Sequence, residues 1–436
     1  MTARRESGSM ERKTAGPDTG GTRRWIPELD GLRVLMIAMV SFYHIWQQSW
    51  LTPAPGGYSL DYLLRSGYIW VDGTVLLSAF LLYRPYAAAR VRGRPLPEIG
   101  AFYRRRARKI LPGYYTVLAL TFFAVCLPYG LYKDPHFMVK DVAAHLTFTF
   151  PFFRDTYLGT QLGAAAWTLA IETQAYLLFP WIARASVKRP VKTAGVLLAV
   201  GLGFRVWCLW SLSEFDMVVN QLPNFLDLYV LGSLLAVGYE RLSLREERRG
   251  ELFRGSAWAA AAVFLLAFWG LLHMLRFQAG SSVYSVNRGF GGWVSRVLNI
   301  ASPSSNYPVI QRNQMVYRPV YGVLFGALML SAPFSLKPLR KILGNRGTRF
   351  LAGISMNYYL VHQIVIVHMR RIGFPKSVSE FPNQAGEQPW QTQYTIWALV
   401  LSLAAAIAVT YLAEKPIQRW MDRRRTKQKD LPAGEA

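Results

Sequence analysis

The hydrophobic positions of the chain gather into ten long apolar stretches, which shorter polar connections separate. Each stretch is close to the ~20 residues that an α-helix needs to cross a bilayer. Long apolar runs of this kind predict helices buried in lipid rather than elements of a soluble core. The expected spans are residues 29–49, 67–87, 111–130, 167–184, 194–212, 221–239, 256–276, 317–335, 350–370 and 393–413. We therefore expect an all-α, polytopic membrane protein with about ten transmembrane helices.

Basic residues are spread unevenly over the connections between these spans. Lys and Arg are dense in the N-terminal tail, in every second connection and after the last span, and sparse in the other connections. Because cytoplasmic loops carry the excess of Lys and Arg, the alternation predicts that both termini are cytoplasmic. We expect disordered basic tails over residues 1–24 and 421–436, and a ten-helix membrane domain over residues 25–420. The location expected is the inner, or plasma, membrane.

Composition and charge fit this arrangement. The 436 residues are 52% hydrophobic and carry a net charge of +25. So basic a chain usually suggests a nucleic-acid partner. Here the basic residues lie mostly between spans, so topology explains them, and we expect membrane lipids and no nucleic acid as partners. Cys126 and Cys208 both lie inside apolar runs, so neither a disulfide framework nor a cysteine-based metal site is expected.

The first span carries two ionisable residues on one face. Arg33 and His44 are eleven residues apart, about three helical turns, which separates them by about 16 Å along the axis. Asp30 lies near the same stripe. Ionisable groups inside a membrane are costly and usually functional, so this span is the first candidate for chemistry. The alternative is that His44 is a hydrogen-bonded core histidine.

Further ionisable residues share the depth of His44. Counting 1.5 Å per residue from the predicted span ends places three carboxylates at that level of the outer half, namely Glu172, Asp72 and Asp227. His362 and Arg205 lie nearer the middle, and Arg205 is expected to pair with one of these carboxylates. A histidine beside a carboxylate can take a proton from a hydroxyl as a general base. The alternative is that these groups only hold helices together.

A run of arginines lies on the predicted cytoplasmic side. Arg104, Arg105, Arg106 and Arg108, together with Arg33 at the inner end of the first span, suit a polyanion such as a phosphate-bearing ligand. Arg105 and Arg108 fall on one face if the segment is helical. The alternative is that the run only anchors the loop on the inner side of the membrane.

Six motifs in this order resemble the acyltransferase 3 family of integral membrane O-acyltransferases. They are Leu29-Asp30-Gly31-Leu32-Arg33 with ten residues between Arg33 and His44, the segment 73–80, the segment 102–112 with its Arg-x-x-Arg and proline, Trp167-Thr168-Leu169-Ala170-Ile171-Glu172, the segment 353–362, and Glu414-Lys415-Pro416. The resemblance covers roughly residues 25–420. One departure is Ala79, where the family commonly has glycine, and a methyl group there slightly restricts helix approach.

The resemblance implies an enzyme that uses acyl-CoA, such as acetyl-CoA, as a co-substrate from the cytoplasm, with no permanently bound cofactor. The acceptor implied is a hydroxyl on a carbohydrate or on a small hydroxylated molecule. By motif, His44 is the catalytic base and Glu172 and Asp30 complete the catalytic set. The substrate-binding residues implied are Arg33, Arg105, Arg108, Ser78, Trp167 and His362. No metal is expected.

Two points stay open at this level. A polytopic transporter or exporter of a polysaccharide or lipid-linked sugar would also place charges in the membrane, although such proteins more often show repeats or broken helix pairs. The connection over residues 277–316, rich in Gly, Ser and Asn, is expected outside, where it either covers a pocket or is disordered.

Overall fold

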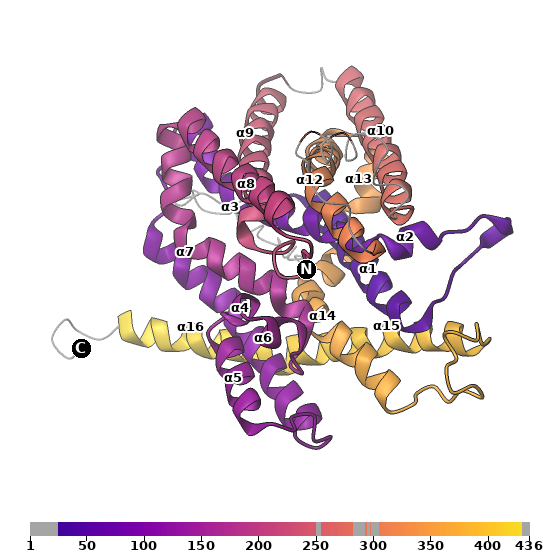
Figure 1. The fold of residues 1–436 in the computed structure, drawn as a ribbon. Helices are drawn as coiled ribbons and strands as arrows, with labels where there is room; N and C mark the ends of the chain where they lie inside the picture. Colours follow the sequence, from indigo (N-terminus) through magenta and orange to yellow (C-terminus); the bar gives the residue numbers. More distant parts are fainter. Residues whose placement is uncertain (1–24, 250–253, 282–292, 294–296, 298–304, 430–436) are drawn as a thin grey trace, which may run out of the picture.

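The computed structural model describes residues 25–249, 254–281, 293, 297 and 305–429. Throughout these ranges the regular structure is helical, and the helices assemble around a shared apolar core (Figure 1). The tail over residues 1–24, the last seven residues and most of the 277–316 connection lie outside the described residues. The all-α, multi-pass fold class expected from the pattern is confirmed.

Each of the ten predicted spans overlaps a long helix. These are α1 (Pro27–Ser49), α3 (Trp70–Arg92), α4 (Ile99–Thr121), α7 (Trp167–Lys188), α8 (Pro190–Ser211), α9 (Leu226–Arg249), α10 (Arg254–Ala279), α12 (Asn306–Ser331), α14 (Arg346–Arg371) and α15 (Trp390–Ala408). Among the described residues, eight helical segments are long and apolar enough to cross a membrane. The two helices outside that set, α3 and α7, carry charged residues within their apolar stretches, and both contribute to the cavity described below.

Shorter helices complete the chain. They are α2 (Asp61–Arg65), α5 (Pro135–Leu146), α6 (Arg154–Leu158), α13 (Lys337–Leu343) and α16 (Lys415–Lys429). A π-helical turn, wider than an α-helical one, spans Val409–Glu414 and joins α15 to α16. Figure 1 shows α15 and α16 as one continuous helical rod. The expectation of disorder from residue 421 onward is therefore wrong as far as Lys429, because α16 continues to that residue.

The first span lies at the centre of the assembly. α1 packs against α3, α13, α14 and α15, so most of its length is surrounded by protein. Gly31 permits the closest of these approaches, since a Cβ there would come within 2.3 Å of the Leu343 carbonyl oxygen. The inner end of α1, which carries Asp30 and Arg33, is thereby fixed against α13.

Contacts among the connections follow the predicted alternation of sides. On the predicted inner side, Arg92 forms an ion pair with Glu240 at 2.6 Å. Arg340 forms another with Glu28 at 2.8 Å. These pairs join the second connection to the sixth, and the eighth to the N-terminal end of α1, all of which are expected inside.

Connections expected outside also contact one another. The Asn220 amide donates to the Tyr157 hydroxyl at 3.0 Å, joining the fifth connection to the third. The Gln391 amide donates to the Ser49 carbonyl at 2.9 Å, joining the ninth to the first. The alternation is therefore built into the fold, while the assignment of one side to the cytoplasm stays a prediction.

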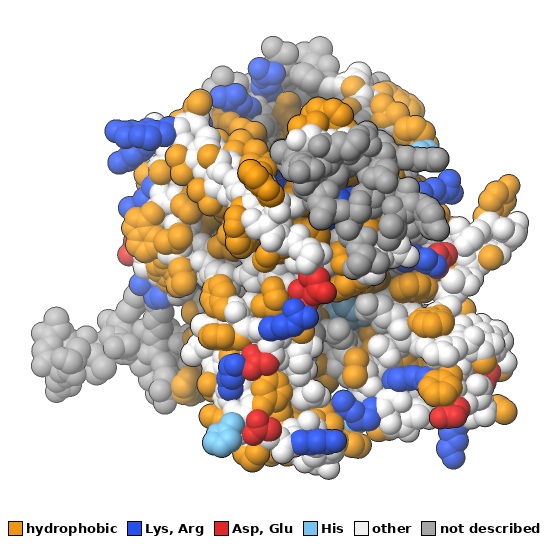
Figure 2. Space-filling view, in the orientation of Figure 1, with side chains coloured by type: hydrophobic (Ala, Val, Ile, Leu, Met, Phe, Trp, Pro, Cys, Tyr) orange, Lys and Arg blue, Asp and Glu red, His pale blue; other side chains and the backbone are white. Residues whose placement is uncertain are grey.

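The surface separates polar from apolar side chains. Figure 2 shows charged side chains gathered around α5 and α6 at one end of the molecule and a broad apolar surface over α7 and α8. On α8, Trp207 and Trp210 are exposed, as expected for side chains that face lipid rather than water. This distribution agrees with a membrane crossing along the long helices.

Four buried charges connect the helices in the halves that are expected to face outward. Arg205 binds Asp227 at 3.0 Å, which confirms that Arg205 takes one of the three expected carboxylates. Asp72 instead binds Arg318 at 3.1 Å, with both side chains fully buried. Both arginines also donate to the carbonyl oxygen of Asn224. Asp72 and Asp227 therefore compensate buried cations, as buried charges require.

Candidate active site

A cavity of about 200 Å³ opens among α1, α3, α4, α7 and α14. Apolar side chains form part of its wall, and polar groups converge on it from the surrounding helices and from the turn before α16. The ionisable and hydroxyl-bearing residues that line it are Arg33, Thr74, Ser78, Arg106, Lys109, Thr168, Glu172, Tyr176, Ser355, Tyr359 and Glu414. Of the residues expected in the site, the structure thus places Arg33, Ser78 and Glu172 together.

Arg33 is held from behind by Asp30. The Asp30 carboxylate accepts a hydrogen bond from the Trp25 indole at 2.9 Å and lies 3.9 Å from the Arg33 guanidinium. Asp30 is buried and does not line the cavity. Its geometry suits the positioning of Arg33, because a buried carboxylate restricts where the long cationic side chain can lie.

Glu172 lines the same cavity and interacts with the next turn of its own helix. Tyr176 donates its hydroxyl proton to Glu172 Oε2 at 2.6 Å. The guanidinium of Arg106 lies over the Tyr176 ring at 5.5 Å and over the Phe102 ring at 5.6 Å. Cation–π contacts of this kind hold a guanidinium in place without neutralising it. Arg106 thus presents a positive charge to the cavity.

The arginine run turns a different face to the cavity than the one expected. Arg105 is exposed, and Arg108 forms an ion pair with Asp422 on α16, so neither lines the cavity. Arg106 and Lys109 line it instead. A signal for this was present in the sequence, because Arg106 continues the apolar stripe of Phe102 and Ile110 at spacings of four residues.

The wider turn between α15 and α16 brings a second carboxylate to the cavity. The Asn357 side chain donates to Thr410 at 2.8 Å and to Glu414, which lies at the end of that turn. Turns of this width are frequent at functional sites. The motif Glu414-Lys415-Pro416 therefore contributes its carboxylate to the cavity wall, a role that the sequence reasoning did not assign.

His44 lies on α1, further toward the C-terminal end of the helix than the residues that line this cavity. Its Nδ1 atom lies 2.9 Å from Gln47 Oε1, and the Gln47 amide nitrogen donates to the Tyr43 hydroxyl at 3.0 Å. In this arrangement Nδ1 carries the proton and Nε2 keeps its lone pair. The expected carboxylate beside His44 is replaced by an amide, which fixes the tautomer without adding a charge.

His362 lies at the level of His44 rather than nearer the middle of the membrane. The two imidazole centroids are 5.2 Å apart. His362 Nδ1 lies 2.7 Å from the Tyr359 carbonyl oxygen, so that nitrogen donates and Nε2 is the acceptor. Nε2 is buried and has no hydrogen-bond partner within the described ranges. Two imidazoles whose Nε2 atoms keep their lone pairs therefore lie side by side.

A hydrogen bond links α1 and α14 beside the cavity. The hydroxyls of Ser41 and Tyr358 are 2.7 Å apart. On α1 the cavity wall ends at Ile37, seven residues before His44, which corresponds to about 10 Å of helix. The cavity and the histidine pair thus follow one another along α1, and on α14 the cavity wall reaches Leu360, two residues before His362.

The depth count misplaced Glu172, which shares a cavity with Arg33 rather than the level of His44. Counting residues assumes that each helix begins at the membrane surface. α7 begins deeper, because the segment before it enters the bundle and packs on α14, where Gly163 lies against Ile364. Because α7 begins at this depth, Trp167 packs against Phe225, with ring centroids 6.3 Å apart, and does not line the cavity.

Ala79 lies against α9 rather than against the cavity. A Cβ at Gly232 would come within 2.7 Å of the Ala79 Cβ, so the glycine that permits close approach is on the opposite helix. The departure from the family pattern at Ala79 therefore leaves the cavity wall, including Ser78, unaffected.

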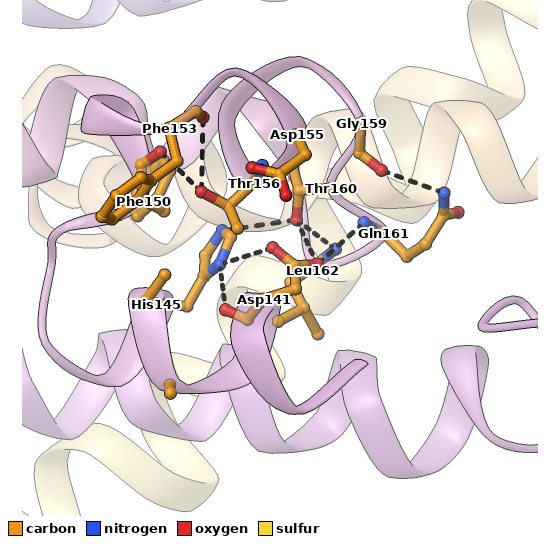
Figure 3. A network of polar contacts seen from close by, with 12 residues as sticks. Asp141, His145, Phe150, Phe153, Asp155, Thr156, Gly159, Thr160, Gln161 and Leu162 are labelled. Atoms are coloured by element: carbon orange, nitrogen blue, oxygen red, sulfur yellow. Dashed lines mark hydrogen bonds and ion pairs between the residues drawn. The ribbon is translucent and has the colours of Figure 1, made fainter. Parts of the chain in front are cut away.

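A buried polar network fixes the segment that precedes α7 and that is expected on the outer side (Figure 3). Asp141 accepts from Thr160 at 2.9 Å and from Tyr132 at 2.6 Å, and its other oxygen lies 3.2 Å from His145 Nδ1. Burial and the hydrogen bond to Asp141 raise the pKa of Tyr132. The His145 ring stacks on Phe150, with centroids 4.0 Å apart. This network holds the segment that leads into α7, and so fixes where α7 begins.

A family described as an acyltransferase domain matches residues 26–415 of the chain. The chain belongs to this acyltransferase family. This match confirms the family predicted from the six motifs. It also confirms the prediction that the protein is an enzyme that transfers acyl groups. Family membership also weighs against the transporter alternative.

Several curated proteins resemble this acyltransferase. Peptidoglycan O-acetyltransferase OatA of Listeria monocytogenes is 26% identical over 420 residues, which cover 91% of the chain and 56% of the relative. O-acetyltransferase OatA of Staphylococcus aureus is 22% identical over 239 residues, covering 51% of the chain and 36% of the relative. The chain spans about half the length, or less, of these relatives. No solved structure matches the chain significantly.

Proposed function

We propose that the chain transfers an acetyl group from acetyl-CoA, bound from the cytoplasmic side, to a carbohydrate hydroxyl on the outer side. The names of the two relatives support acetyl as the group transferred, and the first of them supports peptidoglycan as the acceptor class. The observation that carries the proposal is the sequence of two sites along α1, a cavity lined by three cations and then a histidine whose Nε2 keeps its lone pair.

The basic cavity suits the donor. Arg33, Arg106 and Lys109 supply three cations, and guanidinium groups bind phosphate oxygens through paired donors. The cavity is too small for a whole CoA molecule. The phosphates of CoA would therefore lie at the end of the cavity that is expected to face the cytoplasm. The thin pantetheine arm would continue along α1 past Ser41 and bring the thioester to the histidines.

His44 suits the role of general base. Nε2 would accept the proton of the acceptor hydroxyl while the hydroxyl oxygen attacks the thioester carbonyl carbon. As the carbon–sulfur bond breaks, the thiolate leaves and takes the proton from His44. The products are the O-acetyl ester and CoA with a free thiol. His362 is buried, and exclusion of water beside it would limit hydrolysis of the thioester.

The proposal is tested by supplying acetyl-CoA with a labelled acetyl group to membranes that contain the protein, together with peptidoglycan fragments. We expect a base-labile label on the carbohydrate, in proportion to the amount of protein. A transporter would leave the acetyl group on CoA. Absence of both acetylated carbohydrate and protein-dependent thioester hydrolysis would exclude the proposed reaction.

A further inference from the structure

A second and larger cavity lies on the predicted cytoplasmic side, away from the candidate active site. Its volume is about 870 Å³, within the ~300–1,000 Å³ typical of ligand sites. α9 and α10 form its walls, and α12 and α13 lie between them, as Figure 1 shows. α10 packs on α12, while α9 packs mainly on α3, which leaves a groove between two helices that are consecutive in sequence.

The groove is apolar along most of its length. Ala257 and Ala260 on α10 and Ala327 on α12 are small and leave the space open. Trp258 and Val263 lie at its border and are exposed to the surroundings of the protein, which at this depth are lipid. A groove with this lining and this opening would take hydrocarbon chains from the bilayer.

One end of the groove is basic. Arg245 and Lys337 line it, and neither forms an ion pair with a carboxylate in the described part of the chain. Arg340 lies at the same end and pairs with Glu28. Glu246 is the one carboxylate of the described lining, so cations outnumber it. Basic pockets between transmembrane helices on the cytoplasmic side bind anionic lipid head groups.

We propose that this groove binds an anionic phospholipid of the inner leaflet, with its acyl chains along α10 and its phosphate at Arg245 and Lys337. The apolar length of the groove matches the acyl chains of such a lipid, and its cationic end matches the phosphate. A zwitterionic lipid would leave the excess positive charge of the groove uncompensated. This site lies apart from the cavity that holds Arg33, so it does not depend on the reaction proposed above.

The test is native mass spectrometry of the intact protein, purified and then titrated with phosphatidylglycerol or with phosphatidylcholine of the same chains. We expect wild type to retain phosphatidylglycerol in preference to phosphatidylcholine. The double substitution Arg245→Gln/Lys337→Gln should weaken phosphatidylglycerol binding by about 5-fold per charge removed. Lys188→Gln/Arg189→Gln removes two exposed basic residues at the inner end of α7, outside the groove, and should leave binding unchanged.

A steric pair of variants provides an independent readout. Ala260→Trp fills the groove and should abolish retention of phosphatidylglycerol, whereas Ala259→Trp changes an exposed neighbour that does not line the groove. Thermal unfolding of both variants checks that they fold. Equal retention by the two tryptophan variants, equal binding of both lipids, or equal weakening by the two charge pairs would overturn the proposal.

Discussion

The Nδ1 atom of His44 lies 2.9 Å from the Oε1 atom of Gln47, one turn further along α1. This contact selects the tautomer in which Nε2 can accept a proton. An amide does so without placing a charge beside the imidazole. A base oriented in this way remains neutral until it receives the proton of the acceptor.

Removing the orienting amide should lower turnover more than substrate binding. We expect Gln47→Leu to reduce kcat by about 10-fold, which corresponds to losing one hydrogen bond of ~1.4 kcal/mol, with little change in KM. Gln47→Glu keeps an acceptor at the same position and should restore most of the activity. Gln48→Leu is the control, because it makes the same change at the next residue. In steady-state kinetics of the three variants, Gln48→Leu should have a kcat close to that of wild type.

The two faces of the arginine run give opposite expectations for donor binding. Arg106 lines the cavity whereas Arg105 is exposed, so Arg106→Gln should raise KM for acetyl-CoA by about 10–100-fold and Arg105→Gln should not. The two variants remove the same charge from neighbouring positions of α4, which controls for topology. Equal effects of both on KM would mean that the total charge of this end of α4 matters and that lining the cavity does not.

The buried pair of Arg318 and Asp72 should be costly to break. Arg318→Met leaves a buried carboxylate uncompensated and should destabilise the protein by about 3–5 kcal/mol. Arg318→Met/Asp72→Leu removes both charges and should recover much of that loss. Thermal unfolding in detergent measures both variants. A double variant no more stable than the single one would contradict the assignment of the pair as a mutual compensation.

Membrane sidedness is tested by cysteine labelling in a Cys126→Ser/Cys208→Ser background. Ala54→Cys in the first connection should react with an impermeant thiol reagent from outside, and Arg94→Cys in the second should react only from inside. Both positions are exposed. Labelling of both cysteines from the same side would refute the alternation, and reversed labelling would invert the predicted orientation.

The spans and one buried cation, Arg205, were within reach of the sequence, whereas their mutual placement was not. Apolar length and charge density identified the ten helices, since both depend on each segment alone. The partner of Arg205 was narrowed to three carboxylates, but the choice of Asp227 depends on how α8 meets α9. Arg318 escaped notice because it lies at the start of a predicted span, where an arginine suggests a helix end.

The errors at the site have one physical origin. Positions on one helix are related by a fixed geometry, so Arg33 and His44 were placed correctly along α1. Positions on different helices depend on where each helix begins, and the network around Asp141 sets that point for α7. Rotation of α4 about its axis likewise decides between Arg105 and Arg106, and the buried stripe of Phe102 and Ile110 sets that rotation.

The most direct test supplies labelled acetyl-CoA to the cytoplasmic face of sealed inside-out vesicles that hold peptidoglycan fragments in their lumen. We expect label on the luminal carbohydrate. His44→Ala should reduce it by about 10²–10⁴-fold. His273→Ala, a control at an exposed position on α10, should leave it unchanged. Near-normal transfer by a folded His44→Ala variant, or transfer that requires acetyl-CoA in the lumen, would contradict the account.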